Sequence, residues 1–291
     1  MPYRCSLKGA EMQRIGVIGL GTMGAGIVQS GAEAGCNVVA IDVSEEIVAL
    51  ALERVKQGLD KRVEKGKLDA RSAAFAMASI HGTTKFSELD GCSFVIEAVF
   101  EKQELKKAAI EKISASVGDG TVIATNTSSI SITLLSRYSK MPENFVGMHF
   151  FNPVPLMPLV EIVRGYLTSD STVSAAVSLA KSMKKQTIEV MDYPGFASNR
   201  ILMPMINEAV FALMEGVSTR EGIDGVMKLG MNHPMGPLEL ADFIGLDVCL
   251  DILNVLYSGF KDPKFRPAPL LVNMVNAGKL GRKSGEGFYR Y

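Results

Sequence analysis

A glycine-rich turn between an apolar run and a helical stretch constrains the fold of this chain more than any other feature. Residues 14–18 read RIGVI, and residues 19–24 read GLGTMG directly after them. In a βα unit, the first glycine of such a motif makes the tight turn, the second lets the backbone approach a pyrophosphate, and the third lets the helix pack on the strand. The unpaired N–H groups at the helix N-terminus then face the anion. The motif predicts dinucleotide contacts at Gly19, Gly21, Thr22, Met23 and Gly24.

An acidic residue at the end of the second apolar run narrows the choice of cofactor. Asp42 lies eighteen residues beyond Gly24. A carboxylate at this place accepts hydrogen bonds from the ribose hydroxyls, and its charge repels a 2′-phosphate. We therefore expect NAD as the cofactor, with NADP as the alternative.

Strand-like and helix-like stretches alternate over the first two thirds of the chain. Several strand-like runs are apolar at nearly every position, as in strands that are covered on both faces of a parallel sheet. Helical stretches fill the gaps between them, and Ser44 is the expected N-cap of a long helix. The pattern predicts an α/β fold with a doubly wound, mainly parallel sheet. The strand-like runs are residues 14–19, 37–42, 93–98, 121–125, 145–149, 159–163 and 187–191.

The pattern becomes helical near residue 194. Apolar residues recur every four positions from Ile201 to Met214, and Ser218 begins a capping box for the next helix. No strand-like run follows Met191. We therefore expect a second, all-helical domain. The predicted organisation is an extension at residues 1–13, a nucleotide-binding domain at 14–193 and a helical domain at 194–291.

Composition excludes several classes of partner. Lys and Arg together number 31, as do Asp and Glu, so the net charge is zero and nucleic acid is not an expected partner. No run of eighteen apolar residues occurs, so we expect no membrane span. The four cysteines are too widely spaced for a metal site or a disulfide framework. These features predict reduced thiols, no bound metal and a cytoplasmic location.

Polar side chains follow two strands whose carboxyl ends should lie near the glycine-rich turn. Ser128 follows the run at 121–125, and His149 ends the run at 145–149. Imidazole has an ordinary pKa of about 6.5, which suits proton exchange with a hydroxyl near neutral pH. Glu161 lies within the apolar run LVEIV, where an unpaired carboxylate would be costly. We expect Glu161 to pair with His149 and to orient its ring, as the third member of a catalytic triad does.

Eight segments resemble the 3-hydroxyacyl-CoA dehydrogenase family, and they cover residues 14–291 in the family's order. The length, with no fused hydratase segment, is similar to that of stand-alone bacterial 3-hydroxybutyryl-CoA dehydrogenases. The segments are GLGTMG at 19–24, Asp42, EAVFE at 97–101, NTSS at 126–129, GMHFFNPVPLMPLVEIV at 147–163, YPGFASNR at 193–200, MKLGMNHPMGPLELADFIGLD at 227–247 and GRKSGEGFY at 281–289.

The resemblance implies a Rossmann-like domain, a helical dimerisation domain and an acyl-CoA substrate. It implies that His149 is the catalytic acid/base, with Glu161 as its partner, and that Ser128 and Asn199 contact the substrate near the reacting carbon and thioester. Hydride transfer between the substrate carbon and the nicotinamide would then interconvert a 3-hydroxyacyl-CoA and a 3-ketoacyl-CoA. The same groups serve oxidation, as in fatty-acid breakdown, and reduction, as in butyrate synthesis.

Further contacts are implied by position. Lys65 matches a CoA contact, although Gly58 stands two turns earlier, where some relatives have a hydroxyl. The alternative interpretation of Lys65 is a surface charge. The alternative interpretation of Glu101, Lys102 and Lys106 is a solvated helix start. The positions that match cofactor contacts are Glu101, Lys106, Ser128, Asn152 and Lys283.

The predicted helical domain carries apolar residues on more than one face. Such a surplus favours a homodimer that covers it, and the resemblance implies the same assembly. The alternative is that the α/β domain covers these side chains. The residues in question include Leu202, Met205, Met214, Leu250, Leu253, Leu256 and Leu271.

Two other functions compete with this interpretation. The β-hydroxyacid dehydrogenases share the GLGxMG opening, but they use a lysine where this chain has GFASN at 195–199. A sister group includes sugar-acid dehydrogenases of the gulonate type and lens proteins that bind NAD without catalysis. The presence of both His149 and Glu161 argues against a non-catalytic role.

Overall fold

The computed structural model describes residues 12–291 as two compact units. The first unit contains the chain up to Thr127 together with Ser131–Asp192, and the second contains Ser128–Ile130 and Tyr193–Tyr291. Of the extension predicted at residues 1–13, only Met12 and Gln13 are among the described residues. Each unit has its own apolar core, and they are described separately below.

An eight-stranded sheet forms the centre of the first unit, in the order β3-β2-β1-β4-β5-β6-β7-β8. Every neighbouring pair is parallel except β6 and β7, which are antiparallel. The predicted doubly wound, mainly parallel sheet is therefore confirmed. The strands are β1 (Arg14–Ile18), β2 (Asn37–Ile41), β3 (Ile80–Thr83), β4 (Phe94–Glu97), β5 (Val122–Thr125), β6 (Phe145–Phe150), β7 (Leu159–Arg164) and β8 (Gln186–Met191).

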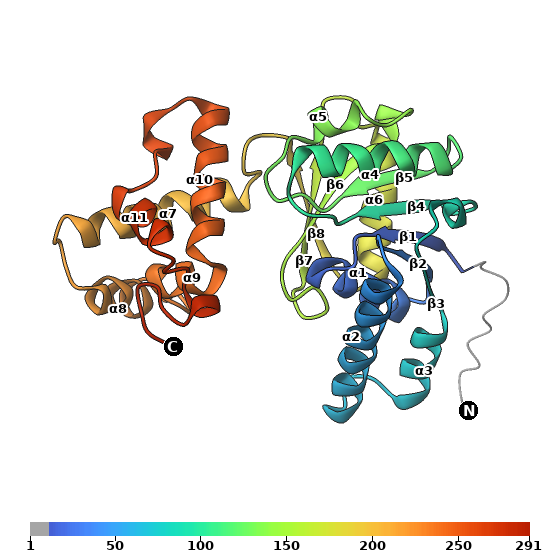
Figure 1. The fold of residues 1–291 in the computed structure, drawn as a ribbon, viewed down its shortest axis with the longest axis horizontal. Coiled ribbons are helices and arrows are strands. Elements are labelled where there is room, and N and C mark those ends of the chain that lie inside the picture. Colours follow the sequence, from blue (N-terminus) through green and yellow to red (C-terminus); the bar gives the residue numbers. More distant parts are fainter. Residues whose placement is uncertain (1–11) are drawn as a thin grey trace, which may run out of the picture. The chain divides into compact units, whose positions relative to one another are not determined.

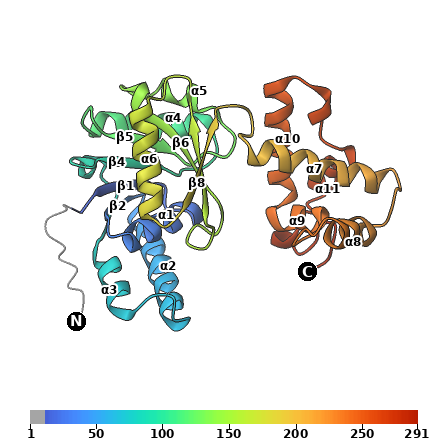
Figure 2. The same cartoon turned by 180° about the vertical axis from the view of Figure 1, so that it is seen from behind.

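Helices cover both faces of this sheet. One continuous core joins α1, α2 and α6 to alternate residues of the strands, including Phe94, Ala124 and Met148. On the opposite face, α4 packs on β4 and β5, and α5 packs on β6. Figure 1 shows α4 in front of the sheet, and Figure 2 shows α6 in front when the view is reversed. The helices are α1 (Thr22–Glu33), α2 (Glu45–Glu64), α3 (Ala70–Ala78), α4 (Gln103–Ser116), α5 (Ile132–Ser136) and α6 (Asp170–Ser182).

The second unit consists of helices, with only isolated β-bridges near the C-terminus. The predicted all-helical second part is therefore confirmed. Asp242, a buried residue of α9, accepts hydrogen bonds from the backbone N–H groups of Phe288 and Tyr289 and so holds the C-terminal segment. The helices are α7 (Ser198–Met214), α8 (Arg220–Gly230), α9 (Pro237–Ile244), α10 (Leu246–Phe260) and α11 (Pro269–Asn276).

Several local predictions differ from the structure. Strand β3 was not predicted, because IHGT has only one apolar β-branched residue and does not alternate. Helix α8 is capped by Thr219, whose hydroxyl accepts from the Gly222 N–H, and not by Ser218. Leu253, Leu256 and Leu271, expected to need a dimer partner, are fully buried within their own unit.

Among residues 12–291, none of the helices combines the length and the apolar character that crossing a membrane requires. The three described cysteines, Cys36, Cys92 and Cys249, are buried and form no disulfide. Burial raises the pKa of each thiol, which keeps the sulfur in its unreactive protonated form. The fourth predicted reduced cysteine, Cys5, lies outside the described residues.

Candidate active site

The glycine-rich turn between β1 and α1 has the geometry that a bound pyrophosphate requires. Gly19 has a φ of +90°, and a Cβ at Gly24 would stand 1.7 Å from the Gly19 carbonyl oxygen. Side chains are therefore excluded at both positions. A Cβ at Gly21, by contrast, would meet no atom within 4 Å, and no side-chain hydrogen bond caps α1 at this residue. The first turn of α1 thus presents its backbone to open space.

Asp42 lies directly after β2, beside this turn. Its Oδ2 accepts a hydrogen bond from the Leu20 N–H at 2.6 Å, and its Oδ1 accepts one from the Val43 N–H at 2.6 Å. The carboxylate is thus fixed by two backbone donors at the carboxyl edge of the sheet. Each carboxylate oxygen has a second lone pair, so the group retains capacity to accept hydrogen bonds from ribose hydroxyls.

The antiparallel pairing of β6 and β7 places His149 directly opposite Glu161. His149 Nδ1 lies 2.8 Å from Glu161 Oε2, and both side chains are almost fully buried. Their neighbours along the strands, Met148 and Ile162, belong to the core on the α1 and α6 side. Because side chains alternate along a strand, His149 and Glu161 lie on the opposite face, which α4 and α5 cover. The structure therefore brings together the predicted pair.

Ser128 and Asn199 also meet. The Asn199 side chain, in the first turn of α7, donates from Nδ2 to the Ser128 backbone oxygen at 3.1 Å, and both residues belong to the second unit. This bond fixes the orientation of the Asn199 amide, since its nitrogen must face the Ser128 carbonyl.

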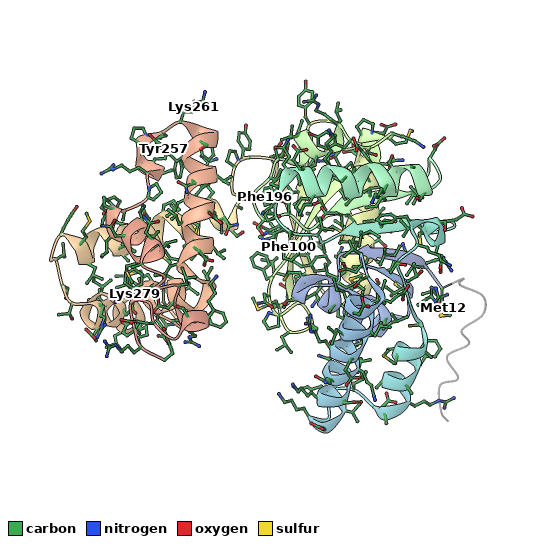
Figure 3. The ribbon with its side chains drawn as sticks, in the orientation of Figure 1. Met12, Phe100, Phe196, Tyr257, Lys261 and Lys279 are labelled. Atoms are coloured by element: carbon green, nitrogen blue, oxygen red, sulfur yellow. The ribbon has the colours of Figure 1, made fainter. Side chains whose placement is uncertain are left out.

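Glu101 and Lys106 are linked at the start of α4. Their charged groups are 3.3 Å apart, but the Lys106 side chain is only 1% exposed and its Nζ also lies 2.9 Å from Glu97 Oε1. The alternative interpretation of Lys106 as part of a solvated helix start is therefore wrong. Figure 3 labels Phe100, which directly precedes Glu101 and is 82% exposed.

Asn152 lies in the loop between β6 and β7, where a cis peptide bond joins it to Pro153. This loop is held by Lys185, whose buried ammonium donates to the backbone oxygens of Val154 and Met157. Burial lowers the pKa of Lys185, because the charged form loses its hydration. The loop that carries Asn152 is thus anchored on the strand β8 side of the sheet.

The two other lysines predicted to bind ligand, Lys283 and Lys65, lie away from the glycine-rich turn in the sequence and on different elements. Lys283 belongs to the second unit, where its Nζ lies 2.5 Å from Asp247 Oδ2. Lys65 is the exposed C-cap of α2. At Gly58, a Cβ would stand 2.3 Å from the Gln29 side-chain oxygen on α1. Close packing of α1 against α2 therefore explains the glycine at this position.

Two family models match consecutive parts of the chain. One, described as 3-hydroxyacyl-CoA dehydrogenase, NAD binding domain, matches residues 14–193. The other, described as 3-hydroxyacyl-CoA dehydrogenase, C-terminal domain, matches residues 195–291. The chain belongs to the 3-hydroxyacyl-CoA dehydrogenase family. The resemblance seen in the sequence is thereby confirmed, and so is NAD as the cofactor of the matched domain.

Two curated relatives and one solved structure match this chain over nearly their whole length. A probable 3-hydroxybutyryl-CoA dehydrogenase from Deinococcus radiodurans is 51% identical over 279 residues, which cover 96% of this chain and 100% of that protein. A 3-hydroxybutyryl-CoA dehydrogenase from Bradyrhizobium diazoefficiens is 46% identical over 282 residues, with 97% and 96% coverage. The crystal structure of an (S)-3-hydroxybutyryl-CoA dehydrogenase from Ralstonia eutropha gives a TM-score of 0.94 at 49% identity and covers 97% of this chain and 99% of that one.

Two buried polar residues that lie next to the candidate site of this chain were not singled out from its sequence. Glu97 and Thr125 are both 0% exposed, and the pairing of β4 with β5 places them opposite each other. Glu97 stands at the end of the apolar run FVIE, where a carboxylate can equally belong to a solvated loop, whereas Glu161 lies inside LVEIV. The rule that a buried carboxylate needs a partner applies to both residues.

Proposed function

We propose that this enzyme interconverts (S)-3-hydroxybutyryl-CoA and acetoacetyl-CoA with NAD, and acts on 3-hydroxyacyl-CoA thioesters as a class. The observation that carries the proposal is the buried His149–Glu161 pair at the carboxyl end of β6, with 2.8 Å between Nδ1 and Oε2. Relatives named 3-hydroxybutyryl-CoA dehydrogenase at 46% and 51% identity support the choice of substrate.

His149 is the proposed acid/base. An ionised Glu161 carboxylate can only accept a hydrogen bond, so the proton between the pair belongs to Nδ1 of His149. In the neutral ring, Nε2 is then the basic nitrogen, and it takes the hydroxyl proton during oxidation. Glu161 stabilises the imidazolium that forms, and the protonated ring returns the proton to the oxygen during reduction.

The cofactor site fits NAD by the geometry of the glycine-rich turn. Gly21 leaves space for the pyrophosphate over the first turn of α1, and Asp42 stands where it can accept from the ribose hydroxyls. When bound, the nicotinamide supplies the carbon that takes or gives the hydride. We assign the remaining cofactor contacts, with Thr22, Met23 and Gly24 in the turn, to Glu101, Ser128, Asn152 and Lys283. The resemblance also implied a contact at Lys106, but its buried ammonium already bonds to Glu97, Glu101 and the Val99 backbone oxygen, so we assign it an indirect role through Glu101.

Ser128 and Asn199 are the proposed contacts to the reacting end of the substrate. The hydrogen bond from Asn199 to the Ser128 backbone holds the two together. A hydroxyl at Ser128 can donate to the substrate oxygen, and the second N–H of the Asn199 amide can polarise the thioester carbonyl. Lys65, an exposed cation, is the proposed contact to the phosphates of CoA.

Assembly as a homodimer through the helical unit is part of the proposal. Helix α8 exposes an apolar strip in which Val226 is 62% and Leu229 is 90% exposed. These residues are three positions apart and so lie on one face of the helix. We further propose that residues 14–193 and 194–291 are the two domains, and that the enzyme works in the cytoplasm, where its buried thiols stay reduced.

A comparison of substrates tests the function. With acetoacetyl-CoA as substrate, the oxidation of NADH is followed by the loss of its near-ultraviolet absorbance, and NADPH is used in a parallel reaction. Oxidation of gulonate with NAD is the competing reaction. We expect turnover with acetoacetyl-CoA and NADH. Activity on gulonate without activity on acetoacetyl-CoA contradicts the proposal, and NADH binding without either reaction supports a non-catalytic role.

A further inference from the structure

Glu97 is a fully buried carboxylate that has no part in the mechanism above. It ends β4, and its side chain lies on the sheet face that α4 covers. Oε1 accepts from the Val99 N–H at 2.7 Å and from Lys106 Nζ at 2.9 Å. Oε2 accepts from the Thr125 hydroxyl at 2.6 Å and lies 3.2 Å from Lys106 Nζ. Both oxygens are therefore bonded twice.

Lys106 uses its ammonium group entirely inside the protein. Besides Glu97, its Nζ contacts the Val99 backbone oxygen at 3.3 Å and Glu101 Oε2 at 3.3 Å. An ammonium has three N–H donors, and two carboxylates and one carbonyl oxygen accept them. The buried positive charge is compensated by Glu97, which leaves the negative charge of Glu101 at the surface of the site.

These contacts close into a ring of five residues, here called the Glu97 ring: Glu97, Lys106, Glu101, Thr127 and Thr125. The Thr127 hydroxyl donates to Glu101 Oε1 at 2.5 Å. The Thr127 backbone N–H donates to the Thr125 hydroxyl oxygen at 3.3 Å, and Thr125 donates in turn to Glu97. Lys106 and Thr127 both bond to Glu101, and both are also attached to Glu97. Lys106 bonds to Glu97 directly, and Thr127 is attached to it through Thr125.

We propose that Glu97 is a positioning residue for the cofactor site. Through Lys106 and Thr125, Glu97 fixes the Glu101 carboxylate and the segment that follows β4. The proposal rests on the proposed function only in treating Glu101 as part of the cofactor-binding surface. The ring joins the ends of β4 and β5 to the first turn of α4 through the protein's own side chains and backbone. A site that is preorganised in this way loses less conformational entropy when the cofactor binds.

Glu97→Gln tests the proposal with little change in side-chain volume. An amide has one acceptor oxygen with two lone pairs, so it cannot accept from Val99, Lys106 and Thr125 together as the carboxylate does. The substitution also removes one of the two carboxylates that lie beside Lys106 among the described residues. Glu101 is then the carboxylate that remains next to the Lys106 ammonium. We expect the Kd for NADH and the KM for NADH to rise about tenfold, while the KM for acetoacetyl-CoA stays within about twofold.

A second readout does not depend on catalysis. In the enzyme without ligand, hydrogen exchange at the Val99 and Thr127 backbone N–H groups should be faster in Glu97→Gln, because their acceptors are lost or displaced. Glu97→Asp keeps the charge with a shorter side chain, and it should recover part of the NADH affinity.

Thr125→Val and Thr121→Val form a matched pair of variants. Thr125 bonds to Glu97. Thr121, the residue directly before β5, is also buried and bonds to the Cys92 backbone oxygen at 2.9 Å. Both changes remove one buried hydroxyl. We expect Thr125→Val to weaken NADH binding by about threefold to tenfold and Thr121→Val to leave it unchanged.

The outcomes separate this inference from the proposed function. If Glu97→Gln and Thr125→Val bind NADH as tightly as the wild type and show unchanged exchange at Val99, the inference is overturned although the enzyme is active. Equal weakening by Thr121→Val and Thr125→Val also overturns it, since general destabilisation then accounts for both. A wild type that binds NADH but does not reduce acetoacetyl-CoA contradicts the proposed function and leaves the test of Glu97 by NADH affinity intact.

Discussion

The carboxylate of Asp42 accepts a hydrogen bond from the Leu20 N–H within the glycine-rich turn, with 2.6 Å between the nitrogen and Oδ2. The residue that faces the cofactor ribose in our proposal therefore also ties the end of β2 to the turn that faces the pyrophosphate. A substitution at Asp42 removes a charge and loosens this turn at the same time, and experiments on cofactor choice must separate the two effects.

Nicotinamide preference is expected to depend on Asp42. In Asp42→Ser combined with Val43→Arg, repulsion of a 2′-phosphate disappears and a cation is added at a position that is 87% exposed. The ratio of kcat/KM for NADPH to that for NADH should rise by about tenfold or more. Val43→Arg alone is the control. A wild type that already prefers NADPH would contradict the assignment of Asp42.

Removal of the imidazole at position 149 should stop catalysis without unfolding the enzyme. We expect His149→Gln to lower kcat by roughly two or more decades, which is the range of general acid/base catalysis, and to keep NADH affinity within about twofold. His81→Gln is the matched control, because His81 is an exposed histidine of β3 that is likewise paired with a carboxylate, Glu88. Turnover within about threefold of the wild type would remove His149 from the mechanism.

The charge of Glu161, and not only its hydrogen bond, is expected to support catalysis. Glu161→Gln keeps an acceptor for His149 Nδ1 but no longer stabilises the imidazolium, so kcat should fall by roughly one to two decades. The low-pH limb of the oxidation profile should move to lower pH. Glu189→Gln, on the neighbouring strand β8, serves as control. An unchanged profile with full activity would limit Glu161 to packing.

The stability of the helical unit should carry a pH signature from Asp242. Burial raises the pKa of this carboxyl above its ordinary 3.8. Below that value the group is protonated in the folded and the unfolded chain, and the cost of its buried charge appears as pH rises through the folded pKa. The free energy of unfolding of the wild type, relative to Asp242→Asn, should therefore fall as the pH rises above about 4. Urea titrations at one fixed protein concentration measure this difference, and a difference that rises with pH would contradict it.

Charge on the apolar strip of α8 should split the dimer. We expect Val226→Glu with Leu229→Glu to give a monomer near 31.3 kDa in sedimentation, whereas the wild type sediments as a dimer. Tyr166→Glu, at an 88% exposed residue of the first unit, is the control. The monomer should also melt at a lower temperature, because dissociation removes the stabilisation that assembly provides. A wild type that is monomeric at micromolar concentration and fully active would refute the assembly.

The sequence predicted the part of the site that depends on local pattern. The turn at 19–24 and Asp42 could be found because they form a specific pattern. Glycines at this spacing, with a carboxylate after the next apolar run, are typical of a dinucleotide site and of few other structures. His149 and Glu161 could be paired because Glu161 interrupts an apolar strand, which makes burial and a partner necessary. These residues were identified from the conflict between their polarity and their surroundings.

Glu97 could not be identified in the same way. It stands at the end of FVIE, and a carboxylate at a strand end is as typical of a solvated loop as of a core. Its burial depends on the pairing of β4 with β5 and on the long side chain of Lys106, which enters from α4. Strand β3 was missed for a related reason, since its pairing with β2 stabilises a short segment whose own sequence favours no strand.

The antiparallel hairpin of β6 and β7 determines which changes of chain length this enzyme can accommodate. His149 meets Glu161 because the two strands are in register, not because twelve positions separate them in the sequence. An insertion within residues 151–158 preserves the encounter as long as the strands keep their pairing, at the expense of the Lys185 contacts in that loop. A deletion of one residue between Leu159 and Glu161 shifts the carboxylate to the other face of the sheet and separates the pair. Alignments of distant homologues should therefore be anchored on the strand register, with gaps confined to the loop.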